Sequence, residues 1–211
     1  MIRVVLLASL LSLSACESVY YDAWEKFGVH KREILIDRIE EAQDAQEEGQ
    51  AQFKNALEQF RAVVNFDGGD LESIYYELDA EYEDSVESAD LIRERIDDVE
   101  SVAEALFDEW SGELDQYSSQ SLRRDSERQL NQTRQRYNRL ISSMRKAEKT
   151  IDPVLDSLKD NVLYLKHNLN ARAIASLKGE LTTVNEDVTN LIDAMQRAID
   201  ESNQFIEQMQ G

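Results

Sequence analysis

Cys16, the only cysteine among the 211 residues, is the residue whose chemistry is most easily recognised from its surroundings. Arg3 is followed by an apolar run over residues 4–13, and small residues precede the cysteine. A positive start, an apolar stretch and small residues at a cleavage point are typical of a secretory signal peptide. The run is far shorter than the roughly 20 residues of a membrane-spanning helix. We therefore expect residues 1–15 to be a signal peptide.

The four residues Leu13-Ser14-Ala15-Cys16 resemble the lipobox of bacterial lipoproteins. The resemblance implies cleavage after Ala15, with Cys16 as the lipid attachment site and acylated N-terminus. A buried structural thiol is the alternative. Glu17 follows, where an aspartate would favour inner-membrane retention in some species. We therefore expect a periplasm-facing lipoprotein of the cell envelope, in the outer membrane.

Other catalytic and ligand-binding patterns are absent from the sequence. Neither His30 nor His167 has a glutamate three residues earlier, so the Glu-x-x-His pairs of di-iron bundles are missing. Zinc sites need several Cys or His ligands, and no Gly-x-Ser-x-Gly turn or Gly-rich phosphate loop occurs. The acidic residues of segment 77–84 lack the glycine turn of an EF-hand. We predict a non-enzymatic protein with no cofactor and no metal.

Polar residues interrupt the apolar pattern in segment 165–172. Its asparagines suit helix caps, and contact with a partner or the cell wall is the alternative. The candidate contact residues are Lys166, His167, Asn168, Asn170 and Arg172.

Charge is distributed unevenly along the chain, which has a net charge of −20. Residues 71–118 carry 2 basic and 17 acidic side chains, whereas residues 119–150 carry 9 basic and 3 acidic ones. Nucleic-acid-binding domains present basic surfaces, so we predict no nucleic-acid partner. The neighbouring acidic and basic segments predict an antiparallel hairpin of two mutually attracting helices.

Apolar residues recur at steps of three and four over most of the chain, as in amphipathic helices. We predict helices at about residues 20–64, 71–111, 119–169 and 172–209, with Asp70 capping the second. Pro153 is expected to kink the third helix, with a sharp turn there as the alternative. The buried seam of the first helix is predicted at Leu35, Ile39, Ala42, Gln46, Gly49, Phe53, Ala56, Phe60 and Val63.

Tyr20, Trp24 and Phe27 extend this seam towards Cys16. We expect them to pack on neighbouring helices, with the membrane interface as the alternative. Leu122 is predicted as the first apolar position of the third helix.

Long helices with short connections predict an all-α fold, an elongated antiparallel four-helix bundle. Two packed coiled-coil hairpins satisfy the same pattern. We expect residues 16–211 to form one domain, a rod about 60 Å long. If Cys16 anchors one end, Trp110 and the C-terminus lie near the membrane, and segments 65–70 and 166–172 form the distal end.

Three stretches resemble a known family: Tyr21 to Leu35, Asp152 to Arg172, and Glu-Glu-Ala-Gln-Asp-Ala-Gln-Glu-Glu from Glu40. They are similar to an uncharacterised family of Gram-negative lipoproteins, catalogued as domain of unknown function 2959 (DUF2959). The resemblance covers the whole mature chain. It implies an envelope lipoprotein with long helices, and it brings no activity, cofactor or catalytic residue.

Three hypotheses about function follow. The first is a lipid-anchored periplasmic rod that acts as an envelope scaffold or adaptor for a protein or cell-wall partner. The second is a module that binds peptidoglycan or another envelope polymer. The third, which requires the N-terminus to be no signal, is a cytoplasmic coiled-coil partner of DNA-processing machinery. The oligomeric state stays open.

Overall fold

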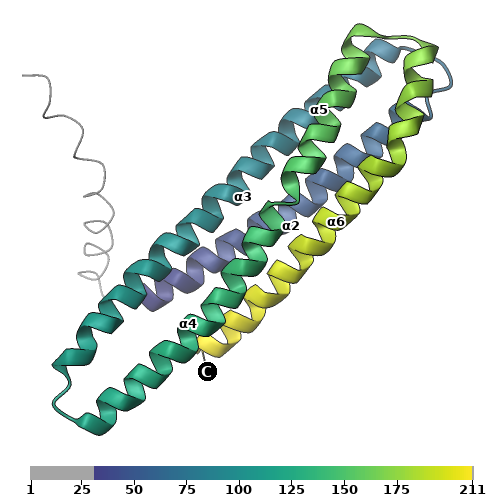
Figure 1. Cartoon of the computed structure of the whole chain (residues 1–211). Coiled ribbons are helices and arrows are strands. Elements are labelled where there is room, and N and C mark those ends of the chain that lie inside the picture. Colours follow the sequence, from purple (N-terminus) through teal and green to yellow (C-terminus); the bar gives the residue numbers. More distant parts are fainter. Residues whose placement is uncertain (1–30, 211) are drawn as a thin grey trace, which may run out of the picture.

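The computed structural model describes residues 31–210, and all of its regular structure is helical. The predicted helical rod is confirmed: long helices lie side by side in an elongated antiparallel bundle (Figure 1). The elements are α2 (Lys31–Val64), α3 (Leu71–Glu113), the 3₁₀ turn η1 (Leu114–Gln116), α4 (Gln120–Glu148), α5 (Ile151–His167) and α6 (Ala171–Gln210). Segment 20–30 of the predicted first helix lies outside the described residues.

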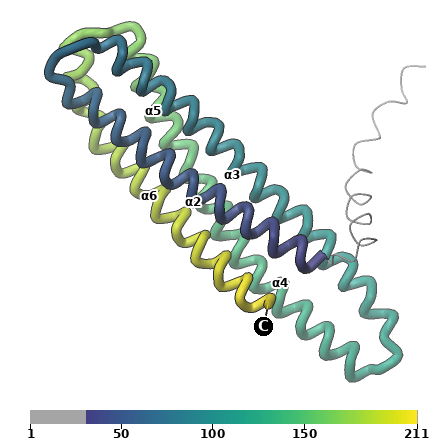
Figure 2. The backbone as a smooth tube through the Cα atoms, turned by 180° about the vertical axis from the view of Figure 1, so that it is seen from behind, coloured from purple at the N-terminus to yellow at the C-terminus, as the bar shows by residue number. Residues whose placement is uncertain are grey.

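Each long helix packs against two neighbours. α2 contacts α3 and α6, while α4 and α5 together contact α3 and α6 on the other side. α2 therefore lies diagonally across the bundle from the α4–α5 pair, and the tube view shows the same arrangement from behind (Figure 2).

The turn between α2 and α3 follows from its glycines and its cap. Gly68 and Gly69 have φ angles of 149° and 122°, which side chains with a Cβ rarely adopt. The carboxylate of Asp70 accepts hydrogen bonds from the backbone N–H groups of Glu72 and Ser73, which confirms it as the N-cap of α3.

The third predicted helix is divided between α4 and α5, which run on in one direction (Figure 1). The break lies at Lys149 and Thr150, ahead of Pro153. A proline ring clashes with the carbonyl of the residue four positions earlier, which here is Lys149. The kink therefore falls one turn before the proline that causes it, and not at the proline itself.

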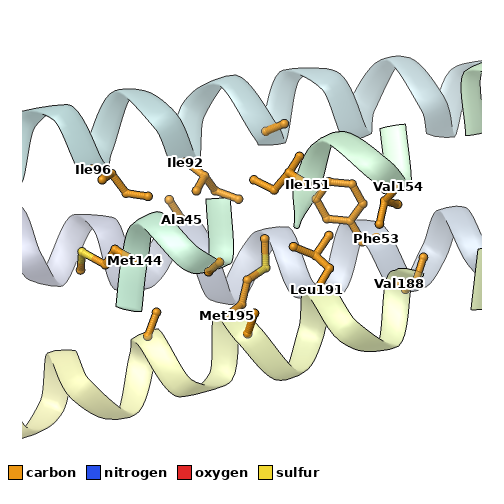
Figure 3. Close-up of a cluster of buried hydrophobic side chains, with 14 of the residues drawn as sticks. Ala45, Phe53, Ile92, Ile96, Met144, Ile151, Val154, Val188, Leu191 and Met195 are labelled. Carbon is orange, nitrogen blue, oxygen red and sulfur yellow. The ribbon is translucent and has the colours of Figure 1, made fainter. Parts of the chain in front are cut away.

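The core runs along the axis of the bundle. All nine positions predicted for the first seam are buried, and Figure 3 shows Phe53 of α2 near Ile151 and Val154 of α5 and Leu191 of α6. Gln46 also lies in the core with no exposure, and neither of its amide atoms has a hydrogen-bond partner.

Leu122, the first apolar position of the third predicted helix, is 56% exposed. α4 begins at Gln120, beyond the level at which α2 begins and α6 ends, so these helices do not cover its first turns (Figure 2).

Candidate functional site

The residues predicted to contact a partner all lie at one end of the rod. We call this end the tip; it consists of the α2–α3 turn, residues 65–70, and the α5–α6 turn, residues 168–170 (Figure 1). Phe66 and Gly68 of the first turn line a hollow of about 350 Å³ together with Ala171 and Ile174 of α6, so the two turns are neighbours. Cys16 lies outside the described residues.

Asn168 and Asn170 serve as helix caps. The Nδ2 atom of Asn168 donates to the carbonyl of Tyr164 at 2.9 Å, at the end of α5. The Oδ1 atom of Asn170 accepts from the N–H groups of Arg172 and Ala173 at 3.0 and 3.2 Å. Both side chains are therefore occupied in ending one helix and starting the next.

Lys166, His167 and Arg172 are exposed around this turn. None of the three forms an ion pair with another described residue. Two of them occupy the last turn of α5, where positive charge interacts favourably with the helix dipole. The charged groups of Lys166 and Arg172 remain accessible to an anionic partner.

A groove of about 460 Å³ runs between α5 and α6 beside the tip, and sequence analysis did not predict it. Asn161 at its base is 6% exposed, and its Nδ2 atom donates to the carbonyl of Ser157 at 2.7 Å. The phenol of Tyr164 donates to Ser176 Oγ at 3.4 Å across the groove. The lining residues are Ser157, Asp160, Asn161, Tyr164, Ser176 and Glu180.

A larger hollow of about 630 Å³ lies near the opposite end of the bundle. Trp110 of α3 and Met209 of α6 both line it, together with Arg32 near the start of α2. The indole N–H of Trp110 donates to Ser126 Oγ at 2.8 Å. Trp110 and the end of α6 are therefore neighbours, at the end of the bundle away from the tip.

Arg145 joins the acidic helix α3 to the basic helix α4, as the charge distribution predicts. Its Nη2 atom lies 2.5 Å from Asp97 Oδ1 and 2.6 Å from Glu100 Oε2, and its Nη1 atom lies 2.8 Å from Glu148 Oε2. The hydrogen bond to Glu100 raises the pKa of Arg145 further above its usual value. An arginine side chain is effectively always protonated in proteins, so this cluster is an ionic link between α3 and α4.

Tyr137 packs beside this link. Its ring meets Phe107 edge to face, with the centroids 5.4 Å apart. Burial raises the pKa of the Tyr137 phenol, and the nearby carboxylate of Glu100 raises it further. The phenol is therefore neutral at physiological pH.

Two further results concern ligands and membranes. Within residues 31–210, no group of three or more His, Cys, Asp or Glu side chains is arranged to hold a metal ion. None of the helices described here is both long and apolar enough to cross a membrane.

Comparison with known proteins identifies the family. No curated protein matches the chain. A family model described as "Protein of unknown function (DUF2959)" matches residues 20–209, which span all the described helices. The chain therefore belongs to the DUF2959 family, as the resemblance in sequence predicted.

Proposed function

We propose that this protein is a lipid-anchored, periplasm-facing rod that acts as a non-enzymatic scaffold or spacer in the cell envelope. The observation that carries the proposal is the direction of the first described helix. α2 begins at Lys31, at the end of the bundle away from the tip, and runs to the tip over 34 residues. At 1.5 Å per residue this is about 50 Å.

An anchor at Cys16 would therefore act on the end opposite the tip. The 14 residues between Cys16 and Lys31 would join the lipid to the start of α2. The accessible cations Lys166 and Arg172 would then face away from the bilayer, by about the length of α2. A rod with this polarity can hold a partner at a set distance from the outer membrane.

Substitution of Cys16 by serine tests the anchor. We expect Cys16→Ser to abolish metabolic labelling with palmitate and to shift the protein out of the membrane fraction. Ser18→Ala, two residues beyond the lipobox, is the matched control and should label like the wild type. An unlabelled wild-type protein, or a serine variant that fractionates unchanged, would contradict the proposal.

A second candidate function is binding of peptidoglycan or another envelope polymer at the tip. The groove beside Tyr164 favours it, because an aromatic ring lies there among carboxylate, amide and hydroxyl groups, which can hydrogen-bond sugars and peptides. Lys166 and Arg172 add accessible positive charge beside it.

Sedimentation with purified cell wall tests this candidate. We expect Tyr164→Ala and the double variant Lys166→Glu/Arg172→Glu each to weaken co-sedimentation. Lys54→Glu, at an exposed position in the middle of α2, controls for charge alone. Unchanged binding in both tip variants would remove this function and leave the spacer proposal standing.

The cytoplasmic hypothesis finds less support. The acidic segment 71–118 and the net charge of −20 oppose approach to nucleic acid, although they do not bear on a protein partner of DNA-processing machinery. Failure of the palmitate experiment would make this hypothesis the next to test.

A further inference from the structure

At the end opposite the tip, α3 and α4 extend past the other two helices. Lys31, the first described residue of α2, forms an ion pair with Glu109 of α3, with Nζ and Oε2 2.9 Å apart. Met209, near the end of α6, lines the same hollow as Trp110. Beyond this level the structure describes only the hairpin of α3, η1 and α4 (Figures 1 and 2). We call this hairpin, residues 110–127, the arm.

The arm carries an apolar face. α2 and α6 pack on this side of α3 and α4 only up to Lys31 and Gln210, so they do not cover the face of the arm. Phe107 and Trp110 of α3 and Leu114 of η1 follow one another at the three- and four-residue steps of the buried seam, and Tyr117 comes directly after η1. Phe107 is 5% exposed, Trp110 and Leu114 are half-buried, and Tyr117 is 38% exposed. The exposure rises along the seam because fewer neighbouring helices remain.

The same change occurs on α4. Leu130 is 3% exposed and Ser126 is 9% exposed, whereas Leu122, one turn further out, is 56% exposed. These positions are four residues apart and therefore lie on one helix face. The arm thus presents apolar side chains from both of its helices that no other described segment covers.

We propose that residues 20–30 of this same chain cover the arm as an upstream continuation of α2. These residues join α2 at Lys31, where the arm begins. Tyr20, Trp24 and Phe27 lead into Lys31 at steps of four, three and four. Lys31 is itself 8% exposed, so the aromatic residues continue a seam position that is already buried.

The register of α2 against α3 specifies which residues meet. The two helices are antiparallel, and Lys31 pairs with Glu109. Continuing this pairing outwards brings Phe27 to the level of Glu113 and Leu114, and Trp24 to the level of Gln116 and Tyr117. Seven residues of helix extend about 10 Å, which brings Trp24 to the level of the turn between η1 and α4. Tyr20 then lies at the outer end of the arm.

Connectivity favours this occupant over a second copy of the chain. Residues 20–30 are joined to α2 at Lys31, where the arm begins, so they act on the arm at a high effective concentration. A second copy would have to bind from solution and lose translational and rotational freedom. The inference depends on the packing at this end of the bundle, and stands apart from the lipid anchor.

Hydrogen exchange on the full-length chain in mild detergent tests the proposal. We expect the amides of residues 22–30 to exchange at least about tenfold more slowly than in an unstructured chain. The double variant Tyr117→Glu/Leu122→Glu should remove this protection, because it places charge on the apolar face of the arm. The matched control is Leu163→Glu/Tyr164→Glu near the tip, which alters a leucine and a tyrosine that are 46% and 40% exposed, and it should leave residues 22–30 protected.

A reciprocal pair of variants keeps the test valid if the arm variant misfolds. Trp24→Ala/Phe27→Ala should accelerate exchange in residues 114–122, whereas Glu25→Ala/Lys26→Ala, off the aromatic stripe, should have a much smaller effect. Fast exchange of residues 22–30 in the wild type would overturn the proposal. Protection that survives both the arm and the aromatic variants would indicate burial in the micelle and would also overturn it. Protection that disappears on dilution would assign the arm to a second copy instead.

Discussion

Gly49 lies where α2 packs closely against α3. A Cβ atom added there would lie 2.7 Å from the Cδ1 atom of Ile92 and 3.3 Å from Ser88 Oγ. Ile92 is 1% exposed, so its side chain has little free space into which it can move. The absence of a side chain at this one position lets the two helices pack tightly, although glycine weakens a helix interior.

Substitution at Gly49 should therefore lower the free energy of unfolding, whereas the same substitution at a glycine with free space around it should raise it. We expect Gly49→Leu to lower the free energy of unfolding by about 1–3 kcal/mol, because it overpacks the interface. Gly179→Leu in α6 has nothing within 4 Å of its added Cβ and should raise it by up to about 1 kcal/mol through helix propensity. Urea denaturation monitored by circular dichroism measures both. Equal effects at the two sites would contradict the close approach.

The pairing of α3 with α4 includes a cluster of charged side chains beside an aromatic pair. Arg145 binds Asp97 and Glu100 across the interface, and Tyr137 packs against Phe107 one helix away. The raised pKa of Tyr137 means that the folded state favours the neutral phenol more than the unfolded state does. Its contribution to stability is therefore complete below the ordinary pKa of 10.0 and declines as the pH rises above it.

Alkaline unfolding should reveal this contribution. Between pH 8 and pH 11, Tyr137→Phe should lose about 1 kcal/mol less stability than the wild type, because one pKa unit corresponds to about 1.4 kcal/mol. Tyr76→Phe, at an exposed ring of α3, controls for the loss of a hydroxyl. Urea titrations at both pH values provide the comparison, and identical pH dependences for the Tyr137 variant and the wild type would refute it.

Sequence patterns predicted the elements better than their ends and their neighbours. All nine seam positions predicted for α2 are buried, including Gln46 and Gly49, because helical spacing alone determines which side of a helix is apolar. The exposure of Leu122 does not follow from helical spacing, because it depends on how far α2 and α6 reach alongside α4. The kink expected near Pro153 lies at Lys149 and Thr150, because the steric effect of a proline ring falls on the preceding turn.

The candidate site, too, could be predicted only in part from the sequence. Asn168 and Asn170 were recognised as possible caps, because capping depends on local sequence, and the structure uses both as caps. The groove at Tyr164 was missed, because its residues come from the polar sides of two helices. Only the register of α5 against α6 brings Tyr164 and Ser176 together, and apolar spacing contains no information on it.

The whole molecule is a rod, with a length set by α3. Its 43 residues correspond to about 64 Å, while the cross-section is that of four helices. A compact domain of about 200 residues has a radius of gyration of roughly 16–17 Å.

Small-angle X-ray scattering should therefore give a larger radius for this chain. We expect roughly 20 Å or more, since a rod about 64 Å long contributes about 18 Å along its axis alone. The maximum dimension should exceed the length of α3. A radius near that of a compact domain would show that the hairpins fold back on each other in solution.

The break at Lys149–Thr150 makes the stiffness of this rod uneven along its length. α2, α3 and α6 pass through the middle of the bundle as continuous helices, whereas the fourth column changes from α4 to α5 there. Around the break, the Thr150 N–H donates to the carbonyl of Ala147, three residues back, and Pro153 has no N–H to donate. A load applied across the rod should therefore bend it at this level, towards or away from the interrupted column. The protein would therefore have one flexible point along its length, at which its two halves can tilt while the part of the core within each half stays packed.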